Sequence, residues 1–236
     1  MFPISDTLKT RRPAYITKTL ALINVFVFLY ELELGTLLEP FLFQYGLIPI
    51  RYTRLFDFQD SIFSLIFPFF TSLFLHGGWL HLISNMWVLW IFGDNVEDRL
   101  GHKTFLLYYL AFGVAAGVAH IAANPHSSLP TIGASGAIAG VMGMYLVLFP
   151  YARVRTLVII FVFIDFWEVP AFLFFSFWFL MQFFNGALSL SGGDAFGGIA
   201  WWAHIGGFIT GMIIAIFHRK KTRRRHDFIY EIPKHY

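Results

Sequence analysis

The chain contains no cysteine, which excludes disulfide bonds and thiolate chemistry. It also has few charges, because only 13% of its 236 residues are Asp, Glu, Lys or Arg. A typical soluble domain carries about 25%. Hydrophobic residues make up 57% of the chain, and the mean hydropathy is +0.65. We therefore expect a membrane protein that crosses the bilayer several times.

Several motifs of other membrane proteins are missing as well. The sequence has no HExxH motif for a zinc protease, and the apolar runs supply no convincing pair of carboxylates for an aspartyl protease. Buried charges near the midplane, which are usual in channels and transporters, are also lacking. The net charge of +3 comes from a basic cluster at the C-terminal end, which suits a membrane surface rather than nucleic acid. We expect no metal and no cofactor.

About 20 apolar residues are needed for a helix that crosses the hydrocarbon core. Two apolar stretches do not meet this requirement, because Ile62–Leu75 is interrupted and Leu157–Trp167 is short. Both are predicted to lie at the interface, and Ile62–Leu75 is alternatively a re-entrant segment. The predicted fold is an all-α membrane protein, a compact bundle of six transmembrane helices. The six runs are Ala14–Leu34, Trp79–Val96, Phe105–Ala123, Gly133–Phe149, Pro170–Leu190 and Gly197–Phe217.

The positions of the basic residues predict the orientation of these six spans. All lysines and arginines except Arg51 and Arg54 then lie on one side of the membrane, together with both termini. Because cytoplasmic loops are enriched in positive charge, both termini are expected in the cytoplasm. The predicted organisation is a cytoplasmic N-terminal segment over residues 1–13, a six-span domain over residues 14–217 and a basic cytoplasmic tail over residues 218–236.

This orientation brings four polar side chains of three different spans to a similar depth near the outer surface. They are His81 and Asn85 in the second span, Ser135 at the start of the fourth and His204 early in the sixth. Polar groups within a membrane are unfavourable unless they are paired, so their common depth indicates either helix–helix hydrogen bonding or function.

Glycine spacing predicts that the fourth and sixth spans approach closely. In each span small residues recur every three or four positions, which leaves one face of the helix bare and lets another backbone come near. Such packing would bring the His204 imidazole to the Ser135 hydroxyl; a helix cap for the serine and a structural hydrogen bond for the histidine are the alternatives. The sets are Gly133, Gly136, Gly140 and Gly143 around Ser135, and Gly207 and Gly211 after His204.

A histidine beside a serine predicts nucleophilic catalysis, because a neutral imidazole can take the hydroxyl proton during attack on an acyl carbon. No carboxylate is placed to orient His204, since Asp194 falls in the preceding loop, so we predict a Ser–His pair without a third member. His81 and Asn85 are four residues apart on one helix face and, with the Ser135 N–H, form a candidate oxyanion hole. Alternatively, Asn85 joins neighbouring helices.

Four short segments carry a resemblance to a known family. The chain resembles the rhomboid intramembrane serine proteases over nearly its whole length, and the joint occurrence of the segments in this order is specific. They are His76-Gly77-Gly78-Trp79-Leu80-His81 followed by Asn85, Gly93…Glu97…Gly101, Gly133-Ala134-Ser135-Gly136, and Ala203-His204-Ile205-Gly206-Gly207 with Gly211.

The resemblance implies a nucleophilic Ser135, a general base at His204, and oxyanion stabilisation by His81, Asn85 and the Ser135 N–H. It also implies that the first loop, over residues 36–75, lies partly in the outer leaflet and that residues 170–190 act as a lateral gate. One departure is at Ala139, where some bacterial members have a tyrosine that stacks under the histidine.

The function expected from these observations is an intramembrane serine endopeptidase. Its partners would be membrane proteins with a transmembrane segment, cleaved near the outer face from within the lipid bilayer, and its location a prokaryotic plasma membrane. An alternative is an inactive rhomboid-like protein that binds transmembrane helices without cleaving them.

Overall fold

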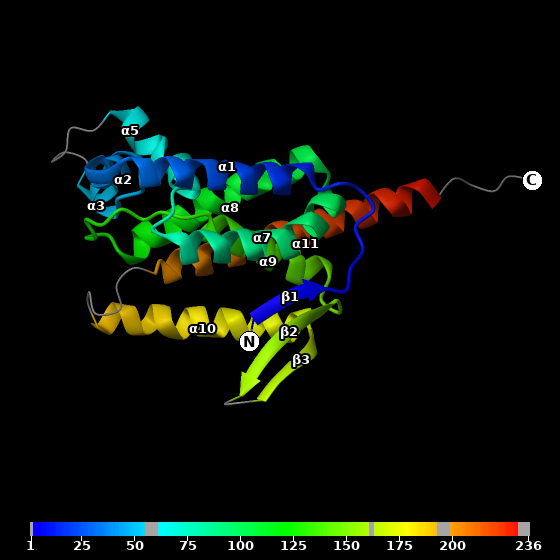
Figure 1. The fold of residues 1–236 in the computed structure, drawn as a ribbon. Helices are drawn as coiled ribbons and strands as arrows, with labels where there is room; N and C mark the ends of the chain where they lie inside the picture. Colours follow the sequence, from blue (N-terminus) through cyan, green and yellow to red (C-terminus); the bar gives the residue numbers. More distant parts are fainter. Residues whose placement is uncertain (1, 55–60, 161–162, 193–198, 231–236) are drawn as a thin grey trace, which may run out of the picture.

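The computed structural model describes residues 2–54, 61–160, 163–192 and 199–230 (Figure 1). The described chain is mostly helical, and each of the six predicted apolar runs contains a helix, although Asp194 and the first residues of the sixth run lie outside the described residues. The helices are α1 (Tyr15–Glu33), α7 (Trp79–Leu100), α8 (His102–Ala123), α9 (Ser135–Leu148), α10 (Ala171–Gly192) and α11 (Trp201–Tyr230).

Helix length and composition identify the candidate membrane spans among the described residues. Four helices are long and apolar enough to cross a membrane: α1, α8, α10 and the part of α11 up to Arg219. A fifth candidate is formed by residues 62–74 together with α7, two segments that meet at an angle of 83°. The remaining helix, α9, has only 14 residues. The chain is thus a multi-span helical protein, and the count of six stays a prediction.

Short helices fill the connection between α1 and α7. Pro49 and Pro68 each stand at the start of one of them, where a missing backbone N–H leaves no hydrogen bond unmade. Residues 62–74 form such short pieces instead of one continuous helix, and their place at the interface stays a prediction. The elements are η1 (Gly35–Leu37), α2 (Leu38–Tyr45), α3 (Pro49–Thr53), α5 (Ile62–Ile66), α6 (Pro68–Thr71) and η2 (Ser72–Phe74).

A three-stranded antiparallel sheet corrects the all-α prediction. It consists of β1 (Phe2–Asp6), β2 (Arg153–Ile160) and β3 (Phe163–Pro170), in the order β1-β2-β3. Within the stretch Leu157–Trp167, expected as an interfacial segment, residues 157–160 and 163–167 therefore belong to two paired strands. The physical reason is a run of β-branched residues with period 2, in which Val154, Thr156 and Val158 are buried.

In this sheet β1 lies beside α7, and β2 and β3 run past the end of α10 at which that helix begins (Figure 1). On one side, the indole N–H of Trp87 on α7 donates a hydrogen bond to the Pro3 carbonyl over 2.7 Å, and the rings of Phe2 and Trp87 are 5.6 Å apart. On the other side, β3 ends at Pro170 and α10 begins at the next residue, Ala171. The N-terminal strand is therefore connected to α10 through the hairpin.

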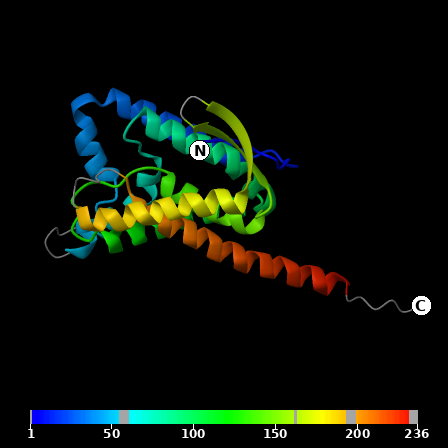
Figure 2. The same ribbon diagram turned by 90° about the horizontal axis from the view of Figure 1, so that it is seen from below.

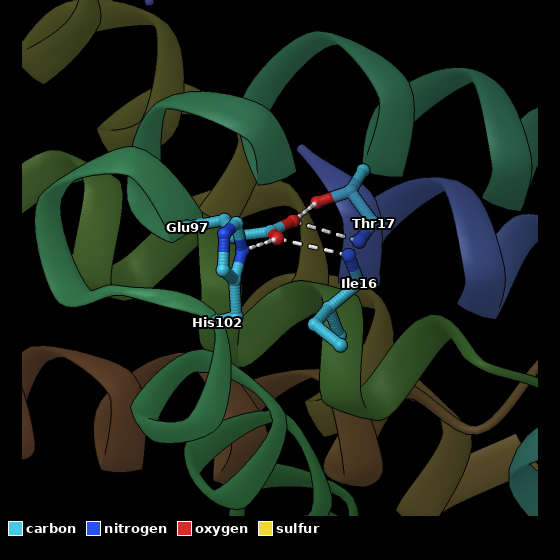
Figure 3. Close-up of polar contacts among 4 residues, drawn as sticks. All are labelled: Ile16, Thr17, Glu97 and His102. Carbon is cyan, nitrogen blue, oxygen red and sulfur yellow. Dashed lines mark hydrogen bonds and ion pairs between the residues drawn. The ribbon is translucent and has the colours of Figure 1, made fainter. Parts of the chain in front are cut away.

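A buried carboxylate fixes one end of α7 (Figure 3). Glu97 accepts hydrogen bonds from the backbone N–H groups of Ile16 (2.8 Å) and Thr17 (2.7 Å) and from the Thr17 hydroxyl (2.7 Å). His102 Nδ1 lies 2.5 Å from the same carboxylate. Glu97 thus pairs with free N–H groups at the start of α1 and joins α1, α7 and α8, so that α7 is anchored at the end opposite to His81 and Asn85.

Helix α9 is the centre of the bundle. All residues from Gly136 to Tyr145 are buried, and α7, α8 and α11 pack around the helix. The far part of α11 extends beyond the other helices (Figure 2). The buried position of α9 places its first residue, Ser135, at a junction of several elements.

Candidate active site

Ser135 and His204 are in direct contact. Ser135 is the first residue of α9, His204 lies in the first turn of α11, and Ser135 Oγ is 2.8 Å from His204 Nε2. The N-cap of α9 is Ala134, and no side chain caps this end of the helix. The serine hydroxyl therefore points to the imidazole rather than to the backbone of its own helix, which argues against a capping role.

Glycines allow the approach of α9 and α11. A Cβ atom built at Gly207 would lie 2.0 Å from the Gly136 carbonyl oxygen, and one built at Gly211 would lie 1.9 Å from the Gly140 carbonyl oxygen. A Cβ atom at Gly143 would likewise come within 2.1 Å of a backbone oxygen of α11. Any side chain at these positions would separate the two backbones. The predicted close approach is confirmed in geometry, while the chemical roles stay predictions.

Two of the glycines on α9 face a second neighbour besides α11. A Cβ atom at Gly136 would lie 2.6 Å from Ala116, and one at Gly140 would lie 2.3 Å from Phe112, both on α8. The stripe thus packs on α11 through its backbone, as predicted, while a side chain at Gly136 or Gly140 would point toward α8. Because α9 is central, its small residues serve two interfaces at once: their carbonyl groups touch α11 and their bare Cα atoms touch α8.

The second ring nitrogen of His204 has a partner that sequence reasoning missed. His204 Nδ1 lies 2.8 Å from Oε1 of Gln182, a buried residue of α10. The Trp178 ring, one turn earlier on α10, is 6.0 Å from the His204 ring, and the Trp201 ring is 6.4 Å away. These side chains occupy the neighbourhood of the imidazole, which Ala139 cannot support. The available signal was an amide within an apolar run, which Gln182 shares with Asn185.

His81 lies close to Ser135, on the other side of Gly133. A Cβ atom built at Gly133 would lie 2.7 Å from His81 Nε2 and 3.8 Å from Ser135 Oγ. The φ angle of Gly133 is +119°, a conformation that residues with a side chain rarely adopt. Glycine therefore keeps open a space that is bordered by a histidine nitrogen and the serine hydroxyl.

Asn85 is buried and hydrogen-bonded within its own helix. Its side-chain N–H group donates to the His81 carbonyl oxygen over 2.8 Å. His76 lies beside the His81 ring, with centroids 5.0 Å apart, and its backbone N–H faces the Glu31 carboxylate at 3.2 Å. The structure thus gathers the predicted polar residues of α7 at the end of the bundle that holds Ser135. Within the described ranges, no group of three or more His, Asp or Glu side chains is arranged to hold a metal ion.

This arrangement is suited to acyl transfer. A hydroxyl that is hydrogen-bonded to an imidazole becomes a nucleophile when the imidazole takes its proton. The first N–H groups of a helix have no acceptor within the helix, so the backbone N–H of Ser135 at the start of α9 is available to a negatively charged oxygen.

Comparison with known proteins identifies similar sequences. The sequence model of the rhomboid domain matches residues 64–221. The rhomboid protease GluP of Bacillus subtilis is 42% identical over 76 residues, which cover 32% of this chain and 14% of that protein. Rhomboid-like protein 11, chloroplastic, of Arabidopsis thaliana is 37% identical over 78 residues, covering 33% of this chain and 28% of the relative.

A mitochondrial relative extends this range of organisms. Rhomboid protein 1, mitochondrial, of Saccharomyces cerevisiae is 33% identical over 102 residues, covering 42% of this chain and 28% of the relative. In each of these three relatives the matched part is less than a third of the protein's own length. The similarity therefore concerns the domain, and it spans bacterial and organellar proteins.

Proposed function

The chain belongs to the rhomboid family, and we propose that it is a serine endopeptidase that cleaves transmembrane segments of other membrane proteins. It is an integral membrane protein with several spans. The observation that carries the proposal is the 2.8 Å contact between Ser135 Oγ and His204 Nε2. Neither helix capping nor lipid packing requires this contact.

The proposed reaction proceeds through an acyl-enzyme. Ser135 Oγ attacks the carbonyl carbon of the scissile peptide bond while His204 Nε2 takes the hydroxyl proton. His204 then gives this proton to the departing amine as the C–N bond breaks. A water molecule, deprotonated by His204, attacks the ester, and the substrate leaves with a new carboxyl group while Ser135 regains its proton.

We assign the stabilisation of the oxyanion to the Ser135 N–H, His81 and Asn85. The space beside Gly133 supports this assignment for His81, because its Nε2 atom borders the same opening as Ser135 Oγ. Asn85 would have to release the His81 carbonyl, or share its amide, in order to donate to the oxyanion. The loss of one such donor typically lowers turnover by about 10²–10³.

The proposed topology has six spans, with both termini in the cytoplasm and the Ser135 end of α9 near the outer face. The central position of α9 supports the count, because a helix of about 21 Å that is surrounded by protein need not match the thickness of the bilayer. The proposed division is a segment over residues 1–13, a protease domain over residues 14–217 and a basic tail over residues 218–236. A prokaryotic plasma membrane is the proposed location.

The substrate must expose a peptide bond that a transmembrane helix normally hides in hydrogen bonds. We therefore propose substrates with glycine, proline or other helix-weakening residues near the outer membrane surface, since such residues lower the free energy of unwinding. The substrate would enter from the lipid beside α10 and extend toward Ser135.

The proposal is tested by cleavage of a single-span reporter protein by the purified chain in lipid vesicles. Wild type should cleave, whereas Ser135→Ala and His204→Ala should not; Ser189→Ala on α10 and His126→Ala on the exposed loop after α8 are matched controls that should keep activity. A fluorophosphonate probe should label wild type but not Ser135→Ala. Equal processing by all variants would end the protease assignment, and a folded wild type that binds the reporter without cleaving it would favour the inactive alternative.

A further inference from the structure

We propose that Gln182 is a positioning residue that holds His204 in the tautomer needed for a general base. The proposal rests on the assignment of His204 as the base. It adds to the Ser–His pair a third group, which comes from α10 rather than from α9 or α11. The expectation of a pair without a third member was based on the absence of a carboxylate, and an amide can make the same hydrogen bond.

The hydrogen-bonding capacities of the three side chains determine where the protons lie. An amide oxygen only accepts, so the 2.8 Å contact from Gln182 Oε1 requires a proton on His204 Nδ1. A neutral imidazole that carries its proton on Nδ1 has a lone pair on Nε2, and Nε2 lies 2.8 Å from Ser135 Oγ. The serine then donates its proton to Nε2, which is the direction that catalysis requires. The opposite tautomer would place two acceptors face to face.

Because Gln182 is buried, its hydrogen bond with His204 is not easily exchanged for one with water. Gln182 is only 7% exposed, so water does not readily replace the lost partner when its amide turns away. A carboxylate at the same place would bring a charge into a membrane-embedded site, which is unfavourable by several kcal/mol. Glutamine provides the acceptor without the charge, and its neutrality suits a site inside a bilayer.

Helix α10 presents two groups to His204 from one face. Trp178 and Gln182 are four residues apart, so they project from the same side of the helix. The Trp178 ring lies 6.0 Å from the imidazole at an interplanar angle of 35°. The Gln182 amide oxygen contacts Nδ1 at the edge of the same imidazole. The two together orient the ring without an aromatic residue at Ala139.

The test combines turnover with a direct reading of the tautomer. Gln182→Met keeps the length and the apolar stem but lacks a strong acceptor, whereas Gln182→Glu keeps an oxygen at the same position. Asn185→Leu is the matched control, because Asn185 is a half-buried amide on the same helix that donates a hydrogen bond to the Met181 carbonyl. We expect Gln182→Met to lower kcat about 10- to 100-fold with an unchanged KM, as for the loss of one buried hydrogen bond. Gln182→Glu should recover most of the lost turnover, because its carboxyl oxygen accepts the same hydrogen bond, but it should lower the unfolding temperature, because the buried site disfavours the charge. Asn185→Leu should match wild type in both measurements.

The tautomer is read by ¹⁵N NMR of histidine-labelled protein in detergent, where the His204 signals are those absent from His204→Ala. Wild type should show a protonated Nδ1 and an unprotonated Nε2, and Gln182→Met should show a mixture. A wild-type Nε2–H tautomer, or a Gln182→Met protein with wild-type spectrum and turnover, would overturn the proposal. The spectrum remains decisive if wild type cleaves nothing, so the failure of the proposed function can be distinguished from the failure of this inference.

Discussion

Helix α11 contacts two of its neighbours, α9 and α10, in different ways. Toward α9 the contact is made by backbone atoms, since a Cβ atom at Gly207 or Gly211 would come within about 2 Å of a carbonyl oxygen. Toward α10 it is made by large side chains, such as Phe179 and Phe208 with ring centroids 5.1 Å apart. A backbone contact has no freedom to adjust, whereas aromatic side chains can repack.

The two catalytic candidates and their proposed positioning residue are distributed over these two interfaces. Ser135 and His204 lie on the two helices that the glycines hold together, and Gln182 lies on the helix held by side chains. Many apolar side chains of α10 are also exposed on its outer surface, among them Phe177 and Phe184. The distance between Ser135 and His204 is thus set by backbone packing, while Gln182, which contacts the second nitrogen of His204, lies on a helix whose contacts with α11 are made by side chains.

The largest effect is expected from Gly207→Ala. The new methyl group would meet the Gly136 carbonyl oxygen at 2.0 Å, so α9 and α11 must separate and the Ser135–His204 bond must lengthen. Overpacking of this kind costs about 1–3 kcal/mol of folding free energy, and we expect labelling of Ser135 by a fluorophosphonate to fall at least about 100-fold. Thermal unfolding in detergent and the labelling rate measure the two effects.

Gly186→Ala is the matched control on the α10 side. Its new Cβ atom would lie 3.3 Å from the Trp201 Cβ atom, a contact that small shifts can relieve. Alanine is also favoured over glycine within a helix by up to about 1 kcal/mol, so stability should change little. Equal losses in the two variants would contradict the distinction between the interfaces.

A smaller, selective effect is expected when α10 is fixed to α11. The native chain is free of cysteine, and the 3.3 Å between the Cβ positions of residues 186 and 201 is just below the usual disulfide range of about 3.5–4.5 Å. We expect an oxidised Gly186→Cys, Trp201→Cys protein to cleave a transmembrane reporter about tenfold more slowly than its reduced form, while fluorophosphonate labelling stays similar. Each single substitution shows the effect of the side chain alone. Identical cleavage in both redox states would mean that α10 stays in place when substrate enters.

The smallest effect is expected at the sheet that leads into α10. Burial raises the pKa of Asp6, against the lowering effect of the hydrogen bond that Tyr145 donates to its carboxylate. A raised pKa means that the folded state binds the proton more tightly than the unfolded state, so this contribution to stability is complete below about pH 4 and is lost as the pH rises through the raised value. Asp6→Asn should weaken the pH dependence of the free energy of unfolding, by less than about 1 kcal/mol. Unfolding temperatures measured across this range for both proteins test it, and parallel curves would contradict the assignment.

The helices and the Ser135–His204 approach were within reach of the sequence. Long apolar runs mark the helices, and glycine at intervals of three and four residues marks the interface between α9 and α11. The sheet was missed because an apolar run of 11 residues was judged by its length, although the alternation of Val154, Thr156 and Val158 with Arg153 and Arg155 carries a strand period.

Gln182 was harder to predict for a physical reason. Its contact with His204 depends on the rotation of α10 about its own axis and on its height beside α11. Neither quantity is encoded in the α10 segment alone, because an aromatic-rich helix offers similar apolar surface on several faces. The same holds for Gly136 and Gly140, whose direction toward α8 follows from the central place of α9.

The pairing of β1 with β2 has a consequence for the time at which the protein is completed in the cell. Phe2 pairs with Leu157, so β1 has no partner until about 150 more residues have been made. At about 5–20 residues per second this takes on the order of 10–30 seconds, during which α1, α7, α8 and α9 are already synthesised. Strand β1 therefore reaches its place late, and its pairing with β2 marks a molecule in which β2 has been made.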